Sequence, residues 1–418
     1  MRQTLFTIDH YLFENHWILI GWLILGMAFM AYQFFWGNKT EAGYFLPVYA
    51  VGAMAIHFVV PKLETLGVNP ADPNGPMVPD GLAIRGYGVF MLLAMVCGIG
   101  LCVYRCRQVG YDFDKLLSLT FWMVVIGIIG ARLFYVIQKY DSFAGLAAGD
   151  LMFALVDMTS GGLVVYGSLI GGVLAASVYM WRNKMPWRQV VDILAPGMVL
   201  GLAIGRIGCL MNGCCYGGVC EASYPGVYFP AASPPYIEQL SSGGLLGIQG
   251  TFDEKTYQVA VESVEPESLA AEYGVKSGDT VRVFLNESQG DIRLRAAKEG
   301  MEMNLDAVVD RLDDDPIFIP VSKLPDDSLR THPTQIYSAV NAFLLTAFLW
   351  FYFPFRKRRG EVFALMCVIY PVCRFLLELI RTDELGAFGT PFTVSQLVSI
   401  CLFVAGLGLF AYVRTRPE

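Results

Sequence analysis

Residues 205–217 read GRIGCLMNGCCYG and close a long apolar run. An arginine inside an apolar segment costs roughly 2.5–3.5 kcal/mol at a helix centre on the membrane-insertion scale, so such a residue usually faces a cavity or a partner. The alternative is that Arg206 reaches from a helix end to the lipid headgroups. The glycines break regular helix and let other groups approach the backbone closely. We therefore expect this stretch to form the wall of a polar cavity near a membrane surface.

The composition indicates an integral membrane protein. Of the 418 residues, 55% are hydrophobic and 16% are charged, whereas soluble domains carry about 25% charged residues. The net charge is −7, but many of the acidic residues lie within 251–328. No basic patch suggests that the protein binds nucleic acid. The first apolar run starts near Trp17 and lacks a small-residue cleavage site, so it reads as an anchor helix.

The apolar segments predict an all-α polytopic membrane protein with about nine transmembrane helices. Each segment is close to the ~20 residues that a bilayer requires. The segments are 17–36, 44–61, 84–104, 117–138, 162–181, 190–210, 335–354, 361–381 and 394–413.

Short basic loops follow the third, fifth and seventh segments, at 105–115, 182–188 and 356–359. Lys and Arg in short loops mark the cytoplasmic side of a membrane. We therefore place these loops and the C-terminus in the cytoplasm. The loops expected on the outer side are 139–160, 211–334 and 382–393.

The outer loop after the sixth segment is far longer than a membrane connection requires, and from about 251 to 325 its composition is that of a soluble domain. The run 264–281 (VEPESLAAEYGVKSGDTV) resembles the strand–helix–turn–strand of a PDZ-like domain. Ser268 can cap a short helix that Gly274 can end. We expect a small α/β or mostly β insert facing outward; a structural lid of mixed type is the alternative.

Several polar groups lie at the outer ends of other membrane segments. Arg374, Glu378 and Arg381 are spaced by four and three residues, so they are expected to share one helix face and to pair along it. This arrangement leaves net positive charge that can bind an anion; the alternative is an ion-paired strut between helices. Arg132 is a further intramembrane cation.

The excess of arginine over carboxylate suits an anionic lipid headgroup, because a guanidinium group binds phosphate with two hydrogen bonds. His332, Tyr87 and Tyr166 are available for proton transfer or for orienting a substrate. A single histidine can equally serve as a structural hydrogen-bonding group.

These motifs together resemble the bacterial prolipoprotein diacylglyceryl transferase family over about 84–217 and 330–413. The family signature reads Gly-Arg-x-Gly-Asn-Phe-x-Asn-x-Glu-x-x-Gly. This chain matches the signature at Gly205, Arg206, Gly208, Asn212 and Gly217.

Other family motifs occur in the same order along the chain. Tyr87-Gly88 matches a tyrosine of the family's first span, and 167–171 matches a glycine-rich motif of its third. Residues 332–337 (HPTQIY) resemble its His-Pro-Ser-Gln-Leu-Tyr, and 374–381 has the spacing of its Arg–Glu–Arg helix.

The resemblance implies a domain organisation around a seven-helix membrane core. The chain adds two N-terminal helices and the outer insert to this core. The expected boundaries are an N-terminal two-helix extension at 1–65, a first core part at 84–217, the insert at 218–330 and a second core part at 331–418.

The activity implied by the resemblance moves the diacylglyceryl group of phosphatidylglycerol to the lipobox cysteine of a prolipoprotein, in the bacterial inner membrane with the active site toward the periplasm. The product is a thioether, glycerol phosphate leaves, and neither a cofactor nor a metal is implied. Arg206 and Arg374 would hold the phosphate and stabilise the charge of the leaving group. His332 would help to deprotonate the incoming thiol.

The remaining site residues are implied to bind or shape the substrate site. Tyr87, Asn212 and Gly217 would shape the headgroup pocket, and Tyr166 would line it. Glu378 would orient the arginines, and Arg381 would add to the positive field.

The chain is a diverged member by this comparison. Cys209 stands where the signature has asparagine, and Cys214 stands where it has glutamate. Tyr166 replaces a histidine that is common in the glycine-rich motif, and Ser338 follows Tyr337 where a glutamate is usual.

Four of the ten cysteines crowd the outer end of the sixth segment, at Cys209, Cys214, Cys215 and Cys220. They are open to three interpretations: a disulfide (Cys215–Cys220 or Cys209–Cys214), apolar packing, or a metal or redox site. The third interpretation gives the first alternative function, a membrane thiol-redox or metal-binding protein. The second is a non-catalytic membrane scaffold whose insert recruits an envelope protein.

Overall fold

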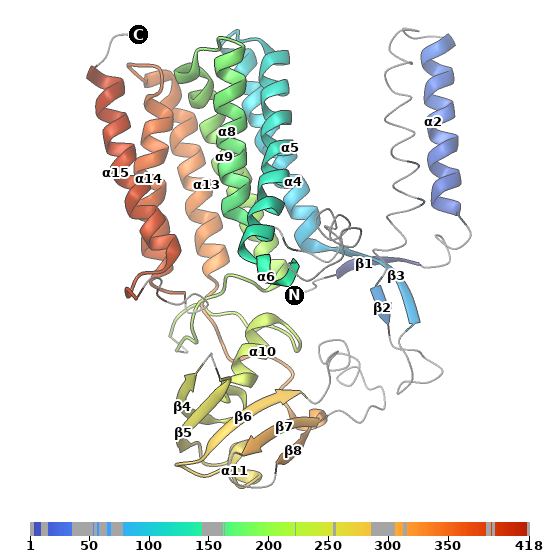
Figure 1. Ribbon diagram of the computed structural model, residues 1–418, viewed down its shortest axis with the longest axis vertical. Coiled ribbons are helices and arrows are strands. Elements are labelled where there is room, and N and C mark those ends of the chain that lie inside the picture. The colour runs from blue at the N-terminus through green and yellow to red at the C-terminus, as the bar shows by residue number, and fades with distance from the viewer. Residues whose placement is uncertain are drawn as a thin grey trace. The chain divides into compact units, whose positions relative to one another are not determined.

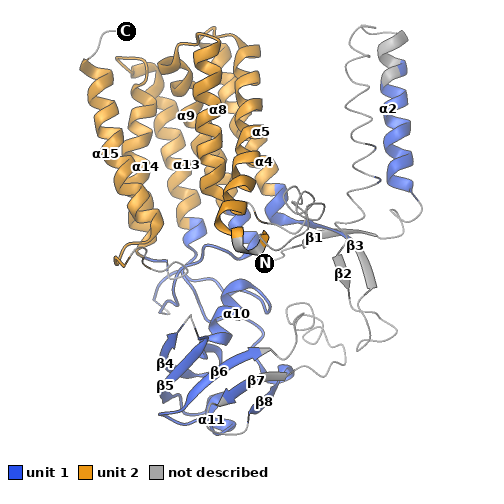
Figure 2. Cartoon of the chain, in the orientation of Figure 1, with its two compact units in different colours: residues 1–89, 207–336, 380–383 blue, residues 90–206, 337–379, 384–418 orange. Residues whose placement is uncertain are grey.

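The computed structural model describes most of the chain. The described residues are 4–9, 16–35, 53, 57, 65–67, 78–143, 162, 164–221, 223–253, 256–285, 306–311, 316–381, 386 and 389–415. The chain divides into two compact units (Figure 2). Unit 1 comprises 1–89, 207–336 and 380–383, and unit 2 comprises 90–206, 337–379 and 384–418.

Long helices dominate the described residues, which confirms a mostly helical polytopic architecture (Figure 1). They are α2 (Trp17–Phe35), α4 (Gly86–Gln108), α5 (Phe113–Gln138), α8 (Val165–Arg182), α9 (Trp187–Asn212), α13 (Thr334–Tyr352), α14 (Glu361–Glu378) and α15 (Val394–Thr415). Five helices of the described chain are long and apolar enough to cross a membrane: α4, α5, α9, α13 with the following η4 (Phe353–Phe355), and α15. The expected span 44–61 lies outside the described residues, apart from two isolated positions, so the number nine stays a prediction.

Small residues let the helices of unit 2 pack at close range. A Cβ atom on Gly130 of α5 would come 2.5 Å from the carbonyl oxygen of Gly167 on α8. One turn further along, a Cβ atom on Gly171 of α8 would come 2.5 Å from the carbonyl oxygen of Ile126. In lipid, where no hydrophobic effect drives helices together, such backbone approach supplies much of the packing. The sequence GSLIGG therefore fixes the α5–α8 contact.

Buried carboxylates tie α9, α14 and α15 together at the end of unit 2 that carries the basic 356–359 run. Asp192 is fully buried, and its carboxylate accepts hydrogen bonds from the backbone N–H groups of Gly360 at 2.7 Å and Phe363 at 3.0 Å. Glu361 is also fully buried and accepts from the Arg414 guanidinium at 2.8 Å. These partners satisfy charges that would be costly if they were buried alone.

Unit 1 contains two antiparallel sheets among its described residues. The first has the order β1-β3-β2, from β1 (Thr4–Asp9), β2 (Thr65–Gly67) and β3 (Val78–Arg85), and the sequence analysis did not predict it. The second is the meander β4-β5-β6-β7-β8 of the insert. Its strands are β4 (Ile248–Asp253), β5 (Gln258–Val264), β6 (Thr280–Leu285), β7 (Asp306–Arg311) and β8 (Ile317–Pro320).

The strand–helix–turn–strand expected at 264–281 is present as β5, α11 (Leu269–Glu272) and β6. The Ser268 hydroxyl accepts a hydrogen bond from the Ala271 N–H at 3.2 Å and so caps α11. Gly274 follows the helix with φ +77°, a conformation that glycine adopts without strain.

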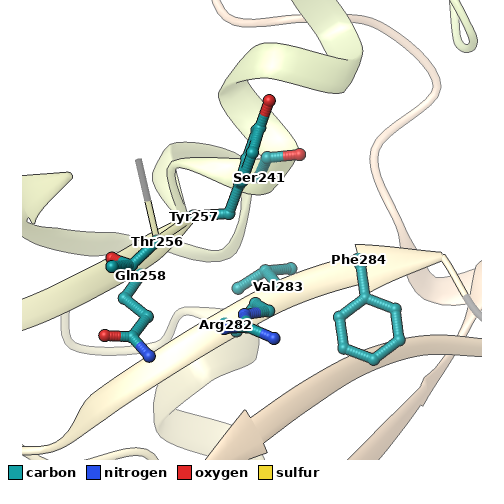
Figure 3. Close-up of a pocket in the computed structure, with 7 residues that line it drawn as sticks. All are labelled: Ser241, Thr256, Tyr257, Gln258, Arg282, Val283 and Phe284. Atoms are coloured by element: carbon teal, nitrogen blue, oxygen red, sulfur yellow. The ribbon is translucent and has the colours of Figure 1, made fainter. Parts of the chain in front are cut away.

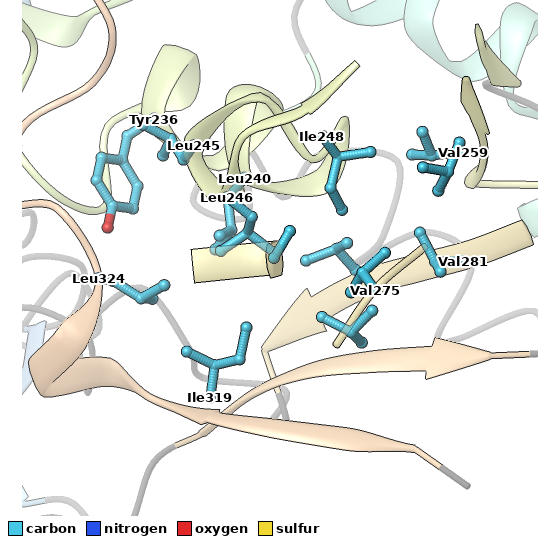
Figure 4. Packing of buried hydrophobic residues seen from close by; sticks show 14 of the residues in the cluster. Tyr236, Leu240, Leu245, Leu246, Ile248, Val259, Val275, Val281, Ile319 and Leu324 are labelled. Atoms are coloured by element: carbon cyan, nitrogen blue, oxygen red, sulfur yellow. The ribbon is translucent and has the colours of Figure 1, made fainter. Parts of the chain in front are cut away.

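The insert has a hydrophobic core of its own (Figure 4). Alternate residues of β5 face this core: Val259 and Val261 are buried, whereas Ala260 is exposed. The helix α10 (Pro234–Ser241) adds Leu240 and Tyr236 to the same cluster. The Tyr236 hydroxyl donates to the Pro325 carbonyl at 2.8 Å, and burial raises the pKa of this phenol.

The chain segments that enter and leave the insert run side by side within unit 1. The Cys220 N–H donates to the Arg330 carbonyl at 2.8 Å, and the Val227 N–H donates to the Thr331 carbonyl at 3.0 Å. Further along, the Ser328 N–H donates to the Phe229 carbonyl at 2.7 Å. We call these two paired segments, 217–230 and 326–332, the stalk.

Candidate active site

The end of α9 carries the signature residues. The expectation that the glycines interrupt the helix is wrong for Gly205 and Gly208, because α9 continues as regular helix to Asn212. Helical hydrogen bonds satisfy the backbone in an apolar environment, and this outweighs the weak helix propensity of glycine, about 1 kcal/mol per residue. The irregular backbone begins at Gly213, with φ +75°. Arg206 and Asn212 therefore both project from α9, and both are half-buried.

Arg374 and Glu378 form a close ion pair on α14, as their spacing predicts. The guanidinium Nη1 lies 2.5 Å from Glu378 Oε2, with side-chain exposures of 13% and 0%. Ser395 accepts a hydrogen bond from Arg374 Nη2 at 3.1 Å, and the Thr393 hydroxyl donates to Glu378 Oε1 at 3.3 Å. The buried carboxylate and the two hydroxyls hold the guanidinium in one orientation while part of it stays accessible.

Arg381 does not share this helix face, so this part of the prediction is wrong. The helix α14 ends at Glu378, and Arg381 instead pairs with Gly217 in an isolated antiparallel bridge. The Gly218 N–H donates to the Ile380 carbonyl at 3.2 Å. These hydrogen bonds to the stalk satisfy the backbone groups of 380–381 in place of a further turn of α14. The spacing of charged residues in the sequence cannot reveal such bonds.

Gly217 and His332 are neighbours in unit 1. The Gly217 N–H donates to the His332 carbonyl at 3.0 Å, and the His332 N–H donates back to the Gly218 carbonyl at 3.0 Å. A Cβ atom on Gly217 would come 2.7 Å from His332 Cβ and 2.8 Å from Thr334 Cγ2. Only glycine allows this approach, which brings the backbones of Gly217, His332 and Arg381 together. The His332 ring lies 5.7 Å from the Tyr224 ring in an edge-on arrangement.

The other predicted site residues lie near helix starts. Tyr87 is in the first turn of α4 and is 39% exposed, and Tyr166 is half-buried in the first turn of α8. Arg132 is buried in α5, where its Nη1 donates to the Gly162 carbonyl at 3.1 Å.

Two residues with structural roles at this site were missed from the sequence. The Thr334 hydroxyl donates to the Cys215 carbonyl at 2.6 Å, and Gln335 Nε2 donates to the Cys214 carbonyl at 2.8 Å. Both side chains are buried. Their place in the HPTQ motif was visible, but nothing in the sequence showed that they bind the loop after α9.

None of the ten cysteines forms a disulfide, so neither predicted disulfide is present. The structure instead brings three of the four crowded cysteines together: the sulfur atoms of Cys209, Cys214 and Cys215 all lie within 4.8 Å of one another. Cys220 belongs to the stalk and is buried.

A pocket of about 490 Å³ lies on the insert (Figure 3). Its lining combines polar side chains with two exposed aromatic rings: Ser241, Thr256, Tyr257, Gln258, Arg282, Val283 and Phe284. No predicted catalytic or substrate-binding residue is in this lining, so the pocket is a feature of the insert alone.

Comparison with known proteins identifies the family. Residues 77–412 match the sequence profile of the family described as prolipoprotein diacylglyceryl transferase. A phosphatidylglycerol–prolipoprotein diacylglyceryl transferase of Rhodopirellula baltica is 36% identical over 100% of this chain and 90% of its own length. An enzyme with this name, numbered 2, from Clostridium perfringens is 26% identical over 79% of this chain and 91% of its own. A phosphatidylglycerol–prolipoprotein diacylglyceryl transferase from Clostridium tetani is 25% identical over 81% of this chain and 96% of its own length. The chain belongs to the prolipoprotein diacylglyceryl transferase family.

Proposed function

We propose that this protein transfers the diacylglyceryl group of phosphatidylglycerol to the lipobox cysteine thiol of prolipoproteins. The observation that carries this function is the 36% identity to a transferase of that name over the whole chain. This identity favours the transferase over a redox protein or a non-catalytic scaffold. The substituted signature positions all lie within residues 77–412, which match the family profile.

The reaction sets two requirements for the site. The substrate sulfur attacks the glyceryl carbon that carries the phosphoester, so a carbon–sulfur bond forms while the carbon–oxygen bond to the phosphate breaks. Glycerol phosphate leaves with the electron pair, and the thiol loses its proton. The site must therefore stabilise a phosphate and promote formation of a thiolate.

Two arginines meet the first requirement in this proposal. Arg374 is held by Glu378 and Ser395 but keeps 13% of its side chain accessible. The Arg374–Glu378 pair is neutral as a whole, so Arg206 on α9 supplies the net positive charge. We assign phosphate binding to Arg206 and Arg374, orientation of Arg374 to Glu378, and a place in the pocket wall to Tyr166.

Other residues named in the sequence analysis are assigned to the second requirement and to the shape of the site. We assign His332 to removal of the thiol proton and Tyr87 to orientation of the reacting groups. Asn212 and Gly217 shape the headgroup pocket, and Arg381 adds positive charge from the bridge it forms with Gly217.

The finer architecture belongs to the same proposal. We place the chain in the bacterial inner membrane with nine spans: a seven-helix core at 84–217 and 331–418, and two further spans within 1–65. The insert at 218–330 lies on the periplasmic side with the active site, and the C-terminus is cytoplasmic. The insert is PDZ-like over about 251–325 and can meet an envelope protein through the pocket of Figure 3.

A transfer assay tests the function directly. Purified protein in vesicles with phosphatidylglycerol and a short lipobox peptide should add a diacylglyceryl mass to the peptide cysteine. Arg206→Ala should lower the rate about 10²–10³-fold, the cost of losing one group that stabilises developing negative charge. Arg107→Ala, an exposed arginine in the last turn of α4, is the matched control. Folded protein that modifies no peptide, or equal rates for the two variants, would contradict the proposal.

A further inference from the structure

Three thiols gather at the end of α9. Cys209 lies in its last turn, Cys214 and Cys215 follow in the adjoining loop, and the three sulfur atoms lie within 4.8 Å of one another. The three side chains are half-buried, and the Cys214 Sγ lies 3.7 Å from the Cys209 carbonyl oxygen. We call Cys209, Cys214 and Cys215 the thiol cluster.

The backbone holds the thiol cluster in one geometry. Gly213 and Cys215 both have positive φ angles, +75° and +60°, and a non-glycine residue rarely adopts that conformation unless its surroundings impose it. Here Thr334 and Gln335 impose it, since they bind the carbonyl groups of Cys215 and Cys214. The loop is therefore fixed from the start of α13.

Gln335 has a second feature that points to a ligand. Its side chain is 1% exposed, and while Nε2 binds the loop, Oε1 has no hydrogen-bond partner among the described residues. A buried acceptor without a partner is rare in folded proteins. A ligand or a ligand-bound water beside the thiol cluster would satisfy it.

Three convergent thiols match the donor set of zinc. Zinc binds cysteine sulfur at about 2.3 Å in tetrahedral geometry, which puts the sulfur atoms about 3.8 Å apart. The sulfur atoms of the thiol cluster, all within 4.8 Å of one another, are close enough together to share one such ion. Zinc sites that act on a substrate use three protein ligands and leave the fourth position open.

We propose that Cys209, Cys214 and Cys215 bind one Zn²⁺ ion whose fourth position takes the lipobox thiol of the substrate. This inference rests on the proposed transferase function. It gives a chemical reason for the substituted signature, because Cys209 and Cys214 stand where the family signature has asparagine and glutamate. A side-chain amide and a carboxylate have been replaced by metal ligands.

The chemistry balances without a change of oxidation state. A thiol that coordinates zinc loses its proton, which passes to solvent or a nearby base. The bound sulfur then forms the carbon–sulfur bond with the glyceryl carbon. The carbon–oxygen bond to phosphate breaks, and glycerol phosphate takes the electron pair. The ion would thus favour the thiolate by lowering the pKa of the bound thiol, and the proton acceptor assigned above, His332, keeps its role.

The metal content of the full-length protein tests the site itself. Protein purified in detergent without chelator should carry one zinc per chain by elemental mass spectrometry. Ser replacements at Cys209, Cys214 or Cys215 should each lower the zinc affinity by more than about tenfold, since the loss of even an outer-shell partner costs about 10–100-fold, and the zinc content should fall with it. Cys220→Ser and Cys401→Ser, outside the thiol cluster, should retain zinc. Metal-free protein that regains no zinc on reconstitution, copper in place of zinc, or a disulfide within the cluster would overturn the proposal.

Cobalt substitution tests the fourth position without any need for catalysis. Wild-type protein stripped by chelation and loaded with Co²⁺ should show thiolate-to-cobalt charge-transfer absorption. A lipobox peptide should strengthen this absorption by adding a fourth sulfur, whereas the peptide with serine in place of cysteine should not. An unchanged spectrum would overturn substrate coordination. Absence of transfer by zinc-loaded protein that passes this test would instead contradict the proposed function alone.

Discussion

Arg374 combines two roles that a single substitution cannot separate. It neutralises the fully buried Glu378 carboxylate, and we assign it to binding the phosphate of the lipid. Removing one partner of a buried ion pair costs about 3–5 kcal/mol because the other charge is left without compensation. A variant that merely unfolds would therefore resemble a variant that fails in catalysis.

A pair of methionine variants separates the two roles. Arg374→Met should lower both the unfolding temperature in detergent and the transfer rate. Arg374→Met/Glu378→Met removes both charges, so it should recover most of the stability, while transfer stays about 10²–10³-fold below the wild type. If the double variant regains transfer, Arg374 is only an ion-paired strut between helices.

Gly217 is predicted to tolerate no side chain. Its Cβ atom in Gly217→Ala would meet His332 Cβ at 2.7 Å, so we expect a loss of about 1–3 kcal/mol in unfolding free energy and a reduced transfer rate. Gly100→Ala in α4 is the control, since a Cβ atom there meets nothing within 4 Å. Thermal unfolding measures the stability of each variant, and the peptide assay measures its transfer rate. Wild-type values of both for Gly217→Ala would show that the stalk accommodates the methyl group.

At this scale the sequence predicted pairs along a helix better than contacts between segments. The four-residue spacing of Arg374 and Glu378 was sufficient to predict their ion pair, because helix geometry alone determines it. The roles of Thr334 and Gln335 depend on bonds to residues more than a hundred positions earlier. No local pattern encodes such contacts.

At the scale of the element, the α5–α8 contact depends on individual glycines. Gly171→Ala would place a Cβ atom 2.5 Å from the Ile126 carbonyl oxygen, which is too close. Gly172→Ala would place its Cβ atom 3.8 Å from the Met123 carbonyl oxygen, an ordinary contact distance. We expect Gly171→Ala to lower the unfolding free energy by about 1–3 kcal/mol through overpacking. Gly172→Ala should be neutral or slightly stabilising, because alanine favours helix. Unfolding in detergent compares the two, and equal stability would contradict this packing.

The positions of the long helices were largely predictable. The predicted segments at 84–104, 117–138 and 394–413 correspond to α4, α5 and α15, with ends that differ by a few residues. Apolar length determines a membrane helix, and this information is local. The pairing of β1 with β3 was not predictable, since it joins strands about seventy residues apart. The end of α14 was missed because its last turn is replaced by bonds to the stalk.

At the scale of the whole molecule, the charge of the short loops predicts the orientation. A membrane-impermeant maleimide should label Ser277→Cys in the insert on intact spheroplasts. Lys184→Cys, in the basic loop after α8, should be labelled only after lysis. Wild-type protein gives the background from the native cysteines. Labelling of Lys184→Cys on intact spheroplasts would contradict the proposed orientation.

The stalk lowers the thermodynamic cost of inserting residues between its two segments. Because the segments 217–230 and 326–332 are hydrogen-bonded to each other, any sequence between them begins and ends at nearly the same point. Closing a loop whose ends are already held costs little more as it lengthens, about 0.6 kcal/mol for each doubling. Residues can thus be added or lost beyond the stalk at little thermodynamic cost. The helices and the insert are therefore free to evolve at different rates, and a lineage can exchange the insert while it keeps the same chemistry.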